Sequence, residues 1–448
     1  MSANESKKQP FPGKSRYLFR VELTDKKGTP YRIDKPAQFL SQKSIERRKR
    51  QSLPIDSTDL PVSPRYIDAI RQAADVEIVG TSKWNNTVLV GSSHDETAQK
   101  LQTLPCVKKI VKVMTAPDSL LLSTRQTLSD KVSHTDTLSK SAYGAGLWQI
   151  EMLNGVKLHE AGFRGKGMTI AVIDGGFMNA DSISYFKNID ILGKKDFAYP
   201  ASPNVCQEQN HGTMVLSTMG TNVPGTFIGT APEASYWLLR SESGYFEQMC
   251  EEDFWAFAAE FADSVGVDLI NSSLGYNEYD NGVGTYSYRE LDGRHALISR
   301  TASMLAAKGI VHVNSAGNSG NNIWKKIGVP ADATAILAVG ALQMDRRNTI
   351  FSSLGPSADG RVKPDVMAPG LNTTVINGAG VISHASGTSF ASPITCGMVA
   401  CLWQALPHKS AFEIIELVKQ AADRRNYPDN VFGFGIPDYW EAYQRGLD

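Results

Sequence analysis

The fold of the larger part of this chain is decided by residues 168–175, which read MTIAVIDG. The run is almost continuously apolar and does not alternate with polar residues, which is typical of a strand covered on both faces. Four similar runs follow it, at Tyr236–Leu239, Val267–Asn271, Ile310–Asn314 and Ala335–Val339. Longer helical stretches, such as Glu251–Val265 and Leu291–Lys308, separate several of these runs. The pattern predicts an α/β domain with a doubly wound, mostly parallel sheet.

The first part of the chain shows a different pattern, which predicts a small α+β domain. In residues 17–23 apolar and polar residues alternate, which predicts a strand. The elements predicted after it are helices at 37–50 and 63–74, strands at 76–79 and 87–90, a helix at 97–104 and a strand at 107–113. With the helix at 37–50 treated as an insertion, this order is typical of a ferredoxin-like domain. Residues 115–142 are rich in Ser, Thr, Asp and Lys, as linkers are. We therefore expect a small domain at 15–114, a linker at 115–142 and the larger domain at 143–448.

Composition and charge argue against two classes of partner. The 448 residues carry 46 basic and 46 acidic side chains, so the net charge gives no reason to expect a nucleic acid or an anionic membrane. No stretch approaches the length of a membrane span. The basic run Arg47–Arg50 follows apolar residues at helical spacing, and we interpret it as a solvated helix face. Residues 1–8 lack the apolar core of a signal peptide, which indicates either a cytoplasmic protein or one whose export signal has been trimmed.

Three polar residues at element boundaries, Asp174, His211 and Ser389, form a candidate catalytic set. Asp174 ends the buried strand, where a carboxylate is costly unless a partner pairs with it. His211 opens a helical stretch, and Ser389 precedes a helix whose dipole favours negative charge on its oxygen. Taken alone, each has an ordinary role, as a turn cap, a structural histidine and a helix cap. Together, in the chain order Asp, His, Ser, they match one known order of the Ser-His-Asp triad and predict a hydrolase.

The segments around these residues resemble those of the subtilisin-like serine proteases, or subtilases. They read VIDG at 172–175, NHGT at 210–213 and GTSFASP at 387–393. The resemblance runs from about Tyr143 to the C-terminus. It includes further segments that read SLG at 273–275, SAGN at 315–318, FSS at 351–353 and DVMAPG at 365–370. It implies a serine endopeptidase with the subtilisin-like fold.

The resemblance also implies a role for each residue of the site. His211 takes the proton from Ser389 as the serine oxygen attacks a peptide carbonyl, and it returns the proton to the departing amine. Asp174 holds the imidazole in the required tautomer and stabilises its charged form. The side-chain amide of Asn318 and the backbone N–H of Ser389 donate to the oxyanion.

Two positions depart from the family's pattern. Gly175 stands where Ser or Thr is usual after the catalytic Asp, and Met214 stands where the family commonly has a second His. Neither position supplies a triad group. We expect the hydrogen bonding around the site to differ from the family's, but not the reaction.

By resemblance, the primary specificity pocket is lined by residues of four short segments. They are Ser273, Leu274, Gly275, Ser315, Ala316, Gly317, Ser319 and Gly328. None is charged, so a basic or acidic substrate side chain would be buried there without a partner. We therefore expect a large apolar residue on the acyl side of the cut bond.

The order of elements in the first domain resembles that of the propeptides of secreted subtilases. The resemblance implies an exported zymogen, in which this domain is the protease's own inhibitor and folding aid. In such propeptides the final strand leads into a tail that lies in the cleft like a substrate. Here the strand ends near Val113, and Leu120–Leu122 follow in polar sequence. We expect self-cleavage between about Pro117 and Lys140, close to Leu122, because this apolar cluster suits the uncharged pocket.

Two further features of the sequence concern a possible disulfide and calcium binding. Cys206 and Cys250 lie in polar loops, and some family members have a disulfide between these two loops; two free thiols are the alternative. Many subtilases bind calcium in a loop after the helix of the catalytic His. Here that loop, residues 222–226, offers one side-chain amide and one hydroxyl, whereas a hard cation takes six or more oxygens. We assign no metal site and expect no cofactor, and leave calcium open.

Two other functions agree less well with the sequence. An α/β-hydrolase esterase or lipase has Gly-x-Ser-x-Gly and the chain order Ser, acid, His, whereas this chain has Ala391 in place of the second Gly and the opposite order. A degenerate protease kept as a binding module would have lost catalytic residues, and here all three triad residues and Asn318 are present. The sequence therefore favours an endopeptidase that acts on protein or peptide substrates.

Overall fold

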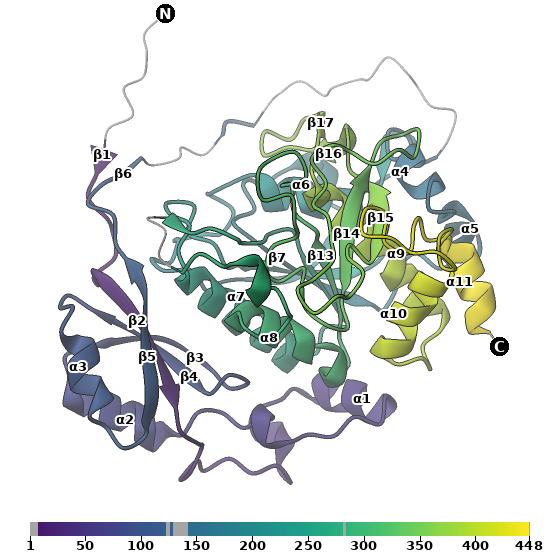
Figure 1. The fold of residues 1–448 in the computed structure, drawn as a ribbon. Coiled ribbons are helices and arrows are strands. Elements are labelled where there is room, and N and C mark those ends of the chain that lie inside the picture. The colour runs from purple at the N-terminus through teal and green to yellow at the C-terminus, as the bar shows by residue number, and fades with distance from the viewer. Residues whose placement is uncertain (1–7, 122–125, 129–141, 281–283, 448) are drawn as a thin grey trace, which may run out of the picture.

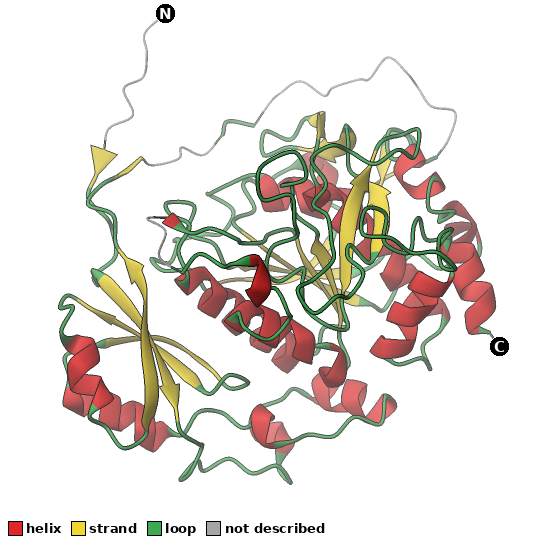
Figure 2. Cartoon of the chain, viewed as in Figure 1, coloured by secondary structure: helices red, strands yellow, loops and turns green. Residues whose placement is uncertain are grey.

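The computed structural model describes residues 8–121, 126–128, 142–280 and 284–447. Figures 1 and 2 show a small unit of strands and helices packed against a larger α/β unit. The candidate catalytic residues all lie in the larger unit.

A sheet of seven strands, in which every pair of neighbours is parallel, organises the larger unit. In sheet order the strands are β15 (Val366–Pro369), β14 (Leu337–Leu342), β13 (Val311–Ser315), β12 (Leu269–Ser272), β7 (Thr169–Asp174), β11 (Ser235–Arg240) and β8 (Asp190–Asp196). The five predicted apolar runs correspond to β7, β11, β12, β13 and β14. The prediction of a doubly wound, mostly parallel sheet is confirmed.

Helices cover both faces of this sheet, and β7 shows why its sequence is apolar throughout. Ile170 and Val172 belong to a cluster on one face, against α6 (His211–Gly220) and α9 (Thr388–Ala405). Ala171 and Ile173 belong to a cluster on the other face, with α7 (Cys250–Val265) and α8 (Leu297–Met304). Since successive strand residues point to opposite faces, burial of both faces requires a continuous apolar run.

Shorter elements complete the larger unit. On the α9 side of the sheet lie α4 (Leu147–Glu151), α5 (Val156–Glu160), α10 (Ala411–Gln420) and α11 (Tyr439–Gly446). Two antiparallel pairs lie outside the main sheet, β9 (Asn222–Val223) with β10 (Phe227–Ile228), and β16 (Thr373–Ile376) with β17 (Ile382–Ala385).

Several elements differ from what the sequence pattern predicts, among them β8 and α8. β8 reads DILGKKD and was not predicted, because it lies at the sheet edge and only alternate residues are partly covered. The helix expected over Leu291–Lys308 is shorter, since α8 begins only at Leu297. Before it, the Asp292 carboxylate accepts from the N–H groups of Arg294 and His295, so a side chain satisfies backbone donors that a helix would use.

The small unit has a four-stranded antiparallel sheet with helices on one face. In sheet order its strands are β3 (Glu77–Ser82), β4 (Thr87–Ser92), β2 (Tyr17–Leu23) and β5 (Val107–Thr115). Its helices α2 (Pro64–Ala73) and α3 (Thr97–Gln102) share one hydrophobic cluster with the sheet. This is the order of elements that the sequence predicts for a ferredoxin-like domain. A short antiparallel pair, β1 (Lys8–Gln9) with β6 (Leu120–Leu121), joins the two ends of the unit.

The inserted helix α1 (Gln42–Arg50) contacts the larger unit and corrects one interpretation. Arg47 and Arg48 are not on a solvated face, because their side chains are each 1 % exposed. Both pair with Asp263 of α7, at 2.5 Å from Arg47 and 2.8 Å from Arg48. Lys83, in the turn between β3 and β4, lies 3.2 Å from the same carboxylate. The basic run therefore joins the two units by buried ion pairs.

Candidate active site

The candidate catalytic residues lie where the carboxyl ends of central strands meet the starts of two helices. Asp174 is the last residue of β7, at the point where the strand order changes direction between β7 and β12. His211 is the first residue of α6, and Ser389 is the second residue of α9. Open parallel sheets bind ligands at such a switch point. The fold thus brings the three residues together on the side of the sheet where the carboxyl ends of the strands lie.

Asp174 and His211 are joined by a partly buried hydrogen bond. Nδ1 of His211 lies 2.9 and 3.0 Å from the two carboxylate oxygens of Asp174, whose side chain is 1 % exposed. The carboxylate also accepts from the N–H of Gly175 at 2.8 Å. Burial lowers the pKa of His211, but the charge of Asp174, its hydrogen bond to the ring and the charge of Glu242 together outweigh burial and raise that pKa to about 9. The pairing places a proton on Nδ1 and leaves Nε2 as the basic nitrogen.

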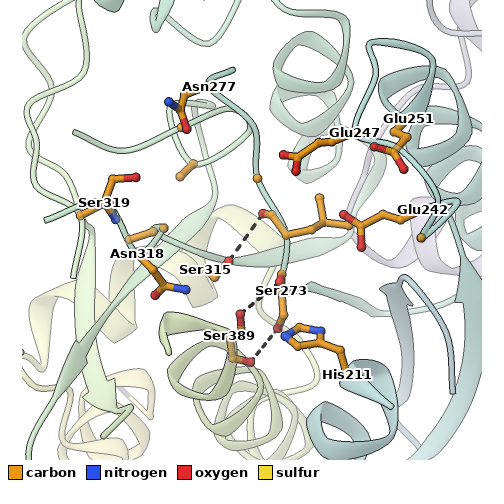
Figure 3. Close-up of a pocket in the computed structure, with 18 of the residues that line it drawn as sticks. His211, Glu242, Glu247, Glu251, Ser273, Asn277, Ser315, Asn318, Ser319 and Ser389 are labelled. Atoms are coloured by element: carbon orange, nitrogen blue, oxygen red, sulfur yellow. Dashed lines mark hydrogen bonds between the residues drawn. The ribbon is translucent and has the colours of Figure 1, made fainter. Parts of the chain in front are cut away.

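Ser389 lies in the same cavity as His211. Its hydroxyl donates to the carbonyl oxygen of Ser273 at 3.3 Å, and the Ser273 hydroxyl donates to the carbonyl of Ser389 at 2.8 Å (Figure 3). No hydrogen bond joins Oγ of Ser389 to His211 in the described part of the chain. Catalytic hydrogen bonds are commonly loose in a site without substrate and tighten when substrate binds.

Asn318 lies in the loop after β13, which is tied to the start of α9. Its Oδ1 accepts from the N–H of Thr388 at 2.9 Å and from the Thr388 hydroxyl at 3.0 Å. The N–H of Gly317 in turn donates to the Thr388 hydroxyl at 3.1 Å. Gly317 has a φ of 105°, and a Cβ there would meet Oγ of Ser353 at 2.8 Å. With its oxygen held in this way, Asn318 has its amide nitrogen available as a donor beside Ser389 (Figure 3).

The two departures from the family pattern have structural explanations. A Cβ at Gly175 would lie 2.6 Å from Oε1 of Gln209 and 3.0 Å from Oε2 of Glu242. These two side chains therefore occupy the volume in which a Ser or Thr side chain would stand. Met214 is half-buried against the main hydrophobic cluster, so an apolar contact replaces the second histidine.

The residues expected to form the primary pocket lie together. All eight line one cavity of about 610 Å³, which His211, Asn318 and Ser389 also line. They are Ser273, Leu274, Gly275, Ser315, Ala316, Gly317, Ser319 and Gly328. An antiparallel backbone bridge joins Tyr276 to Val329, the residue after Gly328. The structure places these side chains beside the candidate nucleophile.

Sequence reasoning missed three glutamates that line the same cavity, Glu242, Glu247 and Glu251. They lie in the loop after β11 and at the start of α7. Burial, then the charge of Asp174, raises the pKa of Glu242 to about 7. Burial and the charge of Glu242 raise the pKa of Glu251. A signal was present, since Glu242 follows the carboxyl end of a buried strand just as the catalytic candidates do.

The expected self-cleavage site at Leu122 lies outside the described residues. On either side of it, the chain contacts the larger unit. Thr115 exchanges two hydrogen bonds with the side chain of Gln248, at 2.8 and 2.9 Å. The carbonyl of Gln126 accepts from the side-chain amide of Asn179 at 3.0 Å.

The structure does not form a disulfide between Cys206 and Cys250. Both are buried free thiols. Cys206 belongs to the cluster under α6 and α9, whereas Cys250 belongs to a cluster between the two units that includes Leu18 and Phe254. A bridge requires Cα atoms within about 7 Å, and each thiol instead fills its own apolar cluster.

Two carbonyl oxygens of the loop at residues 222–226 accept hydrogen bonds from the protein. The carbonyl of Asn222 accepts from the side chain of Asn188, and that of Thr226 accepts from the N–H of Ala145. In the described part of the chain, no group of three or more His, Cys, Asp or Glu side chains is arranged to hold a metal ion. No helix in that part is long and apolar enough to cross a bilayer.

Comparison with known proteins identifies both units. Residues 165–435 match the family model described as Peptidase S8, Subtilase family. Residues 18–130 match the Peptidase S8 propeptide domain of Bacteroidota. The small unit is therefore a propeptide domain.

Among individual proteins, the chain is 28 % identical to Subtilisin DY of Bacillus licheniformis over 272 residues, which cover 59 % of this chain and 87 % of that protein. It is 25 % identical to an alkaline protease of Shouchella clausii over 377 residues, covering 82 % of this chain and 87 % of that protein. It is 28 % identical to the serine protease AprX of Bacillus subtilis over 305 residues, covering 60 % of this chain and 65 % of that protein. The chain belongs to the subtilase family of serine endopeptidases and carries its propeptide domain.

Proposed function

We propose that Ser389, His211 and Asp174 form the catalytic triad of this endopeptidase and that Asn318 completes its oxyanion hole. The observation that carries the proposal is the hydrogen bond between buried Asp174 and Nδ1 of His211, in the cavity that Ser389 also lines. His211 accepts the proton of Ser389 through Nε2 as the serine oxygen attacks, and delivers it to the leaving amine.

Charge that develops on the substrate oxygen meets two donors, the amide nitrogen of Asn318 and the backbone N–H of Ser389. Thr388 holds the oxygen of Asn318 before substrate arrives, so the donor costs little reorganisation during the reaction. Asp174 remains ionised and stabilises the imidazolium that forms.

The cavity supports a preference for a large apolar residue on the acyl side of the cut bond. The pocket residues that the sequence predicts are uncharged and include Leu274, Ala316 and Gly328. A charged side chain among them would lose its hydration without gaining a partner. A peptide library with dominant cleavage after Lys or Arg would contradict this preference.

We further propose that the chain is a self-processing, exported zymogen, with a propeptide at 15–114, a linker at 115–142 and a peptidase at 143–448. Support comes from the chain on both sides of Leu122, which contacts the peptidase at Gln248 and Asn179. Cleavage between Pro117 and Lys140, close to Leu122, would leave the propeptide bound through its buried ion pairs with α7.

A fluorophosphonate probe tests the catalytic assignment. We expect it to label Ser389, and Ser389→Ala to abolish both labelling and peptide hydrolysis without changing the circular dichroism spectrum. An unlabelled but folded protein would point to a binding module, and ester turnover without peptide turnover would point to an esterase.

A further inference from the structure

One side of the active-site cavity carries three glutamates, Glu242, Glu247 and Glu251, which we call the acidic wall, and Asp280 also lines the cavity. Figure 3 shows these side chains on one side of the strand segment that begins at Ser273, and Ser319 on the other. Glu242 also lies near the catalytic pair, since its Oε2 is 3.0 Å from the position that a Cβ on Gly175, the residue after Asp174, would take. The acidic wall is therefore next to the reacting bond.

The acidic wall has no cation of its own among the described residues. No lysine or arginine is among the described residues that line the cavity. Arg240, two residues before Glu242, pairs instead with Asp196 at 2.8 Å and Glu208 at 2.9 Å. Glu242 accepts a phenolic hydrogen bond from Tyr276 at 3.1 Å, and Glu251 accepts the N–H of Ser243 at 2.9 Å.

The negative charge of the acidic wall is not balanced by a lysine or arginine among the described residues that line the cavity. Glu251 is 2 % exposed, so its carboxylate has lost most of its hydration. Glu242 and Glu251 repel each other, and Glu247 adds to the repulsion at both. Buried carboxylates of this kind are stabilised by a cation at hydrogen-bonding distance. The cavity is open to substrate, so the substrate can supply that cation.

The direction of a bound peptide decides which of its residues meets the acidic wall. By resemblance, a substrate lies extended along residues 273–275, with one side chain in the uncharged pocket near Ser319 and Gly328. Successive side chains of an extended peptide point to opposite sides. The residue that precedes the one in the pocket therefore projects to the side where His211 and Glu242 lie.

We propose that the acidic wall selects a lysine or arginine as the second residue before the cut bond, with an apolar residue between it and that bond. Glu242 is the direct partner of the basic side chain, and Glu247 adds to the negative potential. This inference rests on the proposed peptidase site, and it names specificity-determining residues that the uncharged pocket does not contain.

The same carboxylates have a second effect that the test must separate. Glu242 raises the pKa of His211 through its charge, so a Glu242 variant changes the rate for every substrate. A specificity role instead changes the ratio of rates for two substrates that differ only in charge. That ratio is independent of the state of His211, because both substrates meet the same enzyme.

The test compares kcat/KM for two matched peptides, with arginine or its neutral isostere citrulline as the second residue before the cut. We expect the mature wild-type enzyme to prefer arginine by about tenfold or more at low ionic strength. Glu242→Gln should reduce the ratio to about two- to threefold. Glu247→Gln, on an exposed loop residue, should reduce it less and provides a second variant whose folding is not at risk. Glu151→Gln, on an exposed residue of α4, should leave the ratio unchanged.

Three outcomes decide the inference. Equal rates for arginine and citrulline in the wild type overturn it, while hydrolysis of both peptides leaves the proposed peptidase function standing. An arginine preference that persists in Glu242→Gln and Glu247→Gln also overturns it, because the preference would then arise elsewhere. Failure to hydrolyse either peptide, in a preparation that a fluorophosphonate does not label, counts against the catalytic assignment instead.

Discussion

Replacing Arg47 by methionine in the propeptide should weaken its binding to the mature protease by about two orders of magnitude. Among the described residues, the guanidinium of Arg47 donates hydrogen bonds to the peptidase and to Ser44 of its own helix. It lies 2.5 Å from Asp263, and it donates to the carbonyl of Val267 at 2.6 Å and to that of Lys308 at 3.3 Å. Methionine has a similar length but removes the charge and all these donors.

The magnitude follows from the burial of the pair. Breaking a buried ion pair by removing one partner costs about 3–5 kcal/mol, because the other charge stays desolvated. Asp263 keeps Arg48 and Lys83 as partners, so we take the lower end. At 1.4 kcal/mol for each tenfold change, about 3 kcal/mol corresponds to roughly a hundredfold rise in the inhibition constant.

The assay is inhibition of the mature enzyme by the propeptide, residues 1 to about 122, added in trans. Arg50→Met is the matched control, because Arg50 lies on the same helix but is 46 % exposed and 3.6 Å from Asp268. Such surface pairs contribute about 0.2–1 kcal/mol, so its inhibition constant should change by less than about fivefold. Inhibition by Arg47→Met as tight as by the wild type, with a native circular dichroism spectrum, would refute the role given to this ion pair.

The remaining predictions concern turnover, pH and maturation. Asn318→Ala should lower kcat by about 10²–10³ with little change in KM, and near-normal steady-state turnover would exclude Asn318 from the oxyanion hole. The neutral form of His211 is the base, so kcat/KM should rise with pH until the pKa of about 9 is passed. Glu242→Gln removes a charge that raises the pKa of His211, so it should move this rise in kcat/KM to lower pH. A pH profile that does not move in the variant would contradict the coupling between Glu242 and His211. By mass spectrometry, the wild type should mature to a fragment that begins between residues 117 and 140, while Ser389→Ala stays full length; equal processing of the variant in a protease-free preparation would refute self-cleavage.

Elements buried on both faces were predictable from the sequence, because burial leaves a continuous apolar run. The five predicted strands, which are β7, β11, β12, β13 and β14, are of this kind. β8 was missed because it lies at the sheet edge, where Asp190–Asp196 is partly exposed and its sequence is polar. A local sequence pattern indicates burial, and β8 has too little buried surface to produce such a pattern.

Side chains whose role depends on a distant partner were not predictable. Arg47 and Arg48 read as surface residues because no pattern near them reveals Asp263, more than 200 positions away. The acidic wall was missed for the same reason, since Glu242 and Glu251 come from a loop and a helix that only the fold brings to the cavity. The members of the candidate triad were found because each lies in a short motif of its own.

The sharing of α7 between the two units has a consequence for how the peptidase folds. Three carboxylates on this helix take their partners from the propeptide: Asp253 from Arg20, Glu260 from the N–H groups of Lys83 and Trp84, and Asp263 from Arg47, Arg48 and Lys83. When the propeptide leaves, all three lose these partners together. A denatured mature chain would have to fold with these three carboxylates of α7 unpaired. The full-length chain folds with their propeptide partners present in the same molecule. If the propeptide is released as proposed, the lifetime of the mature enzyme would depend on how slowly it unfolds, because refolding would lack these partners.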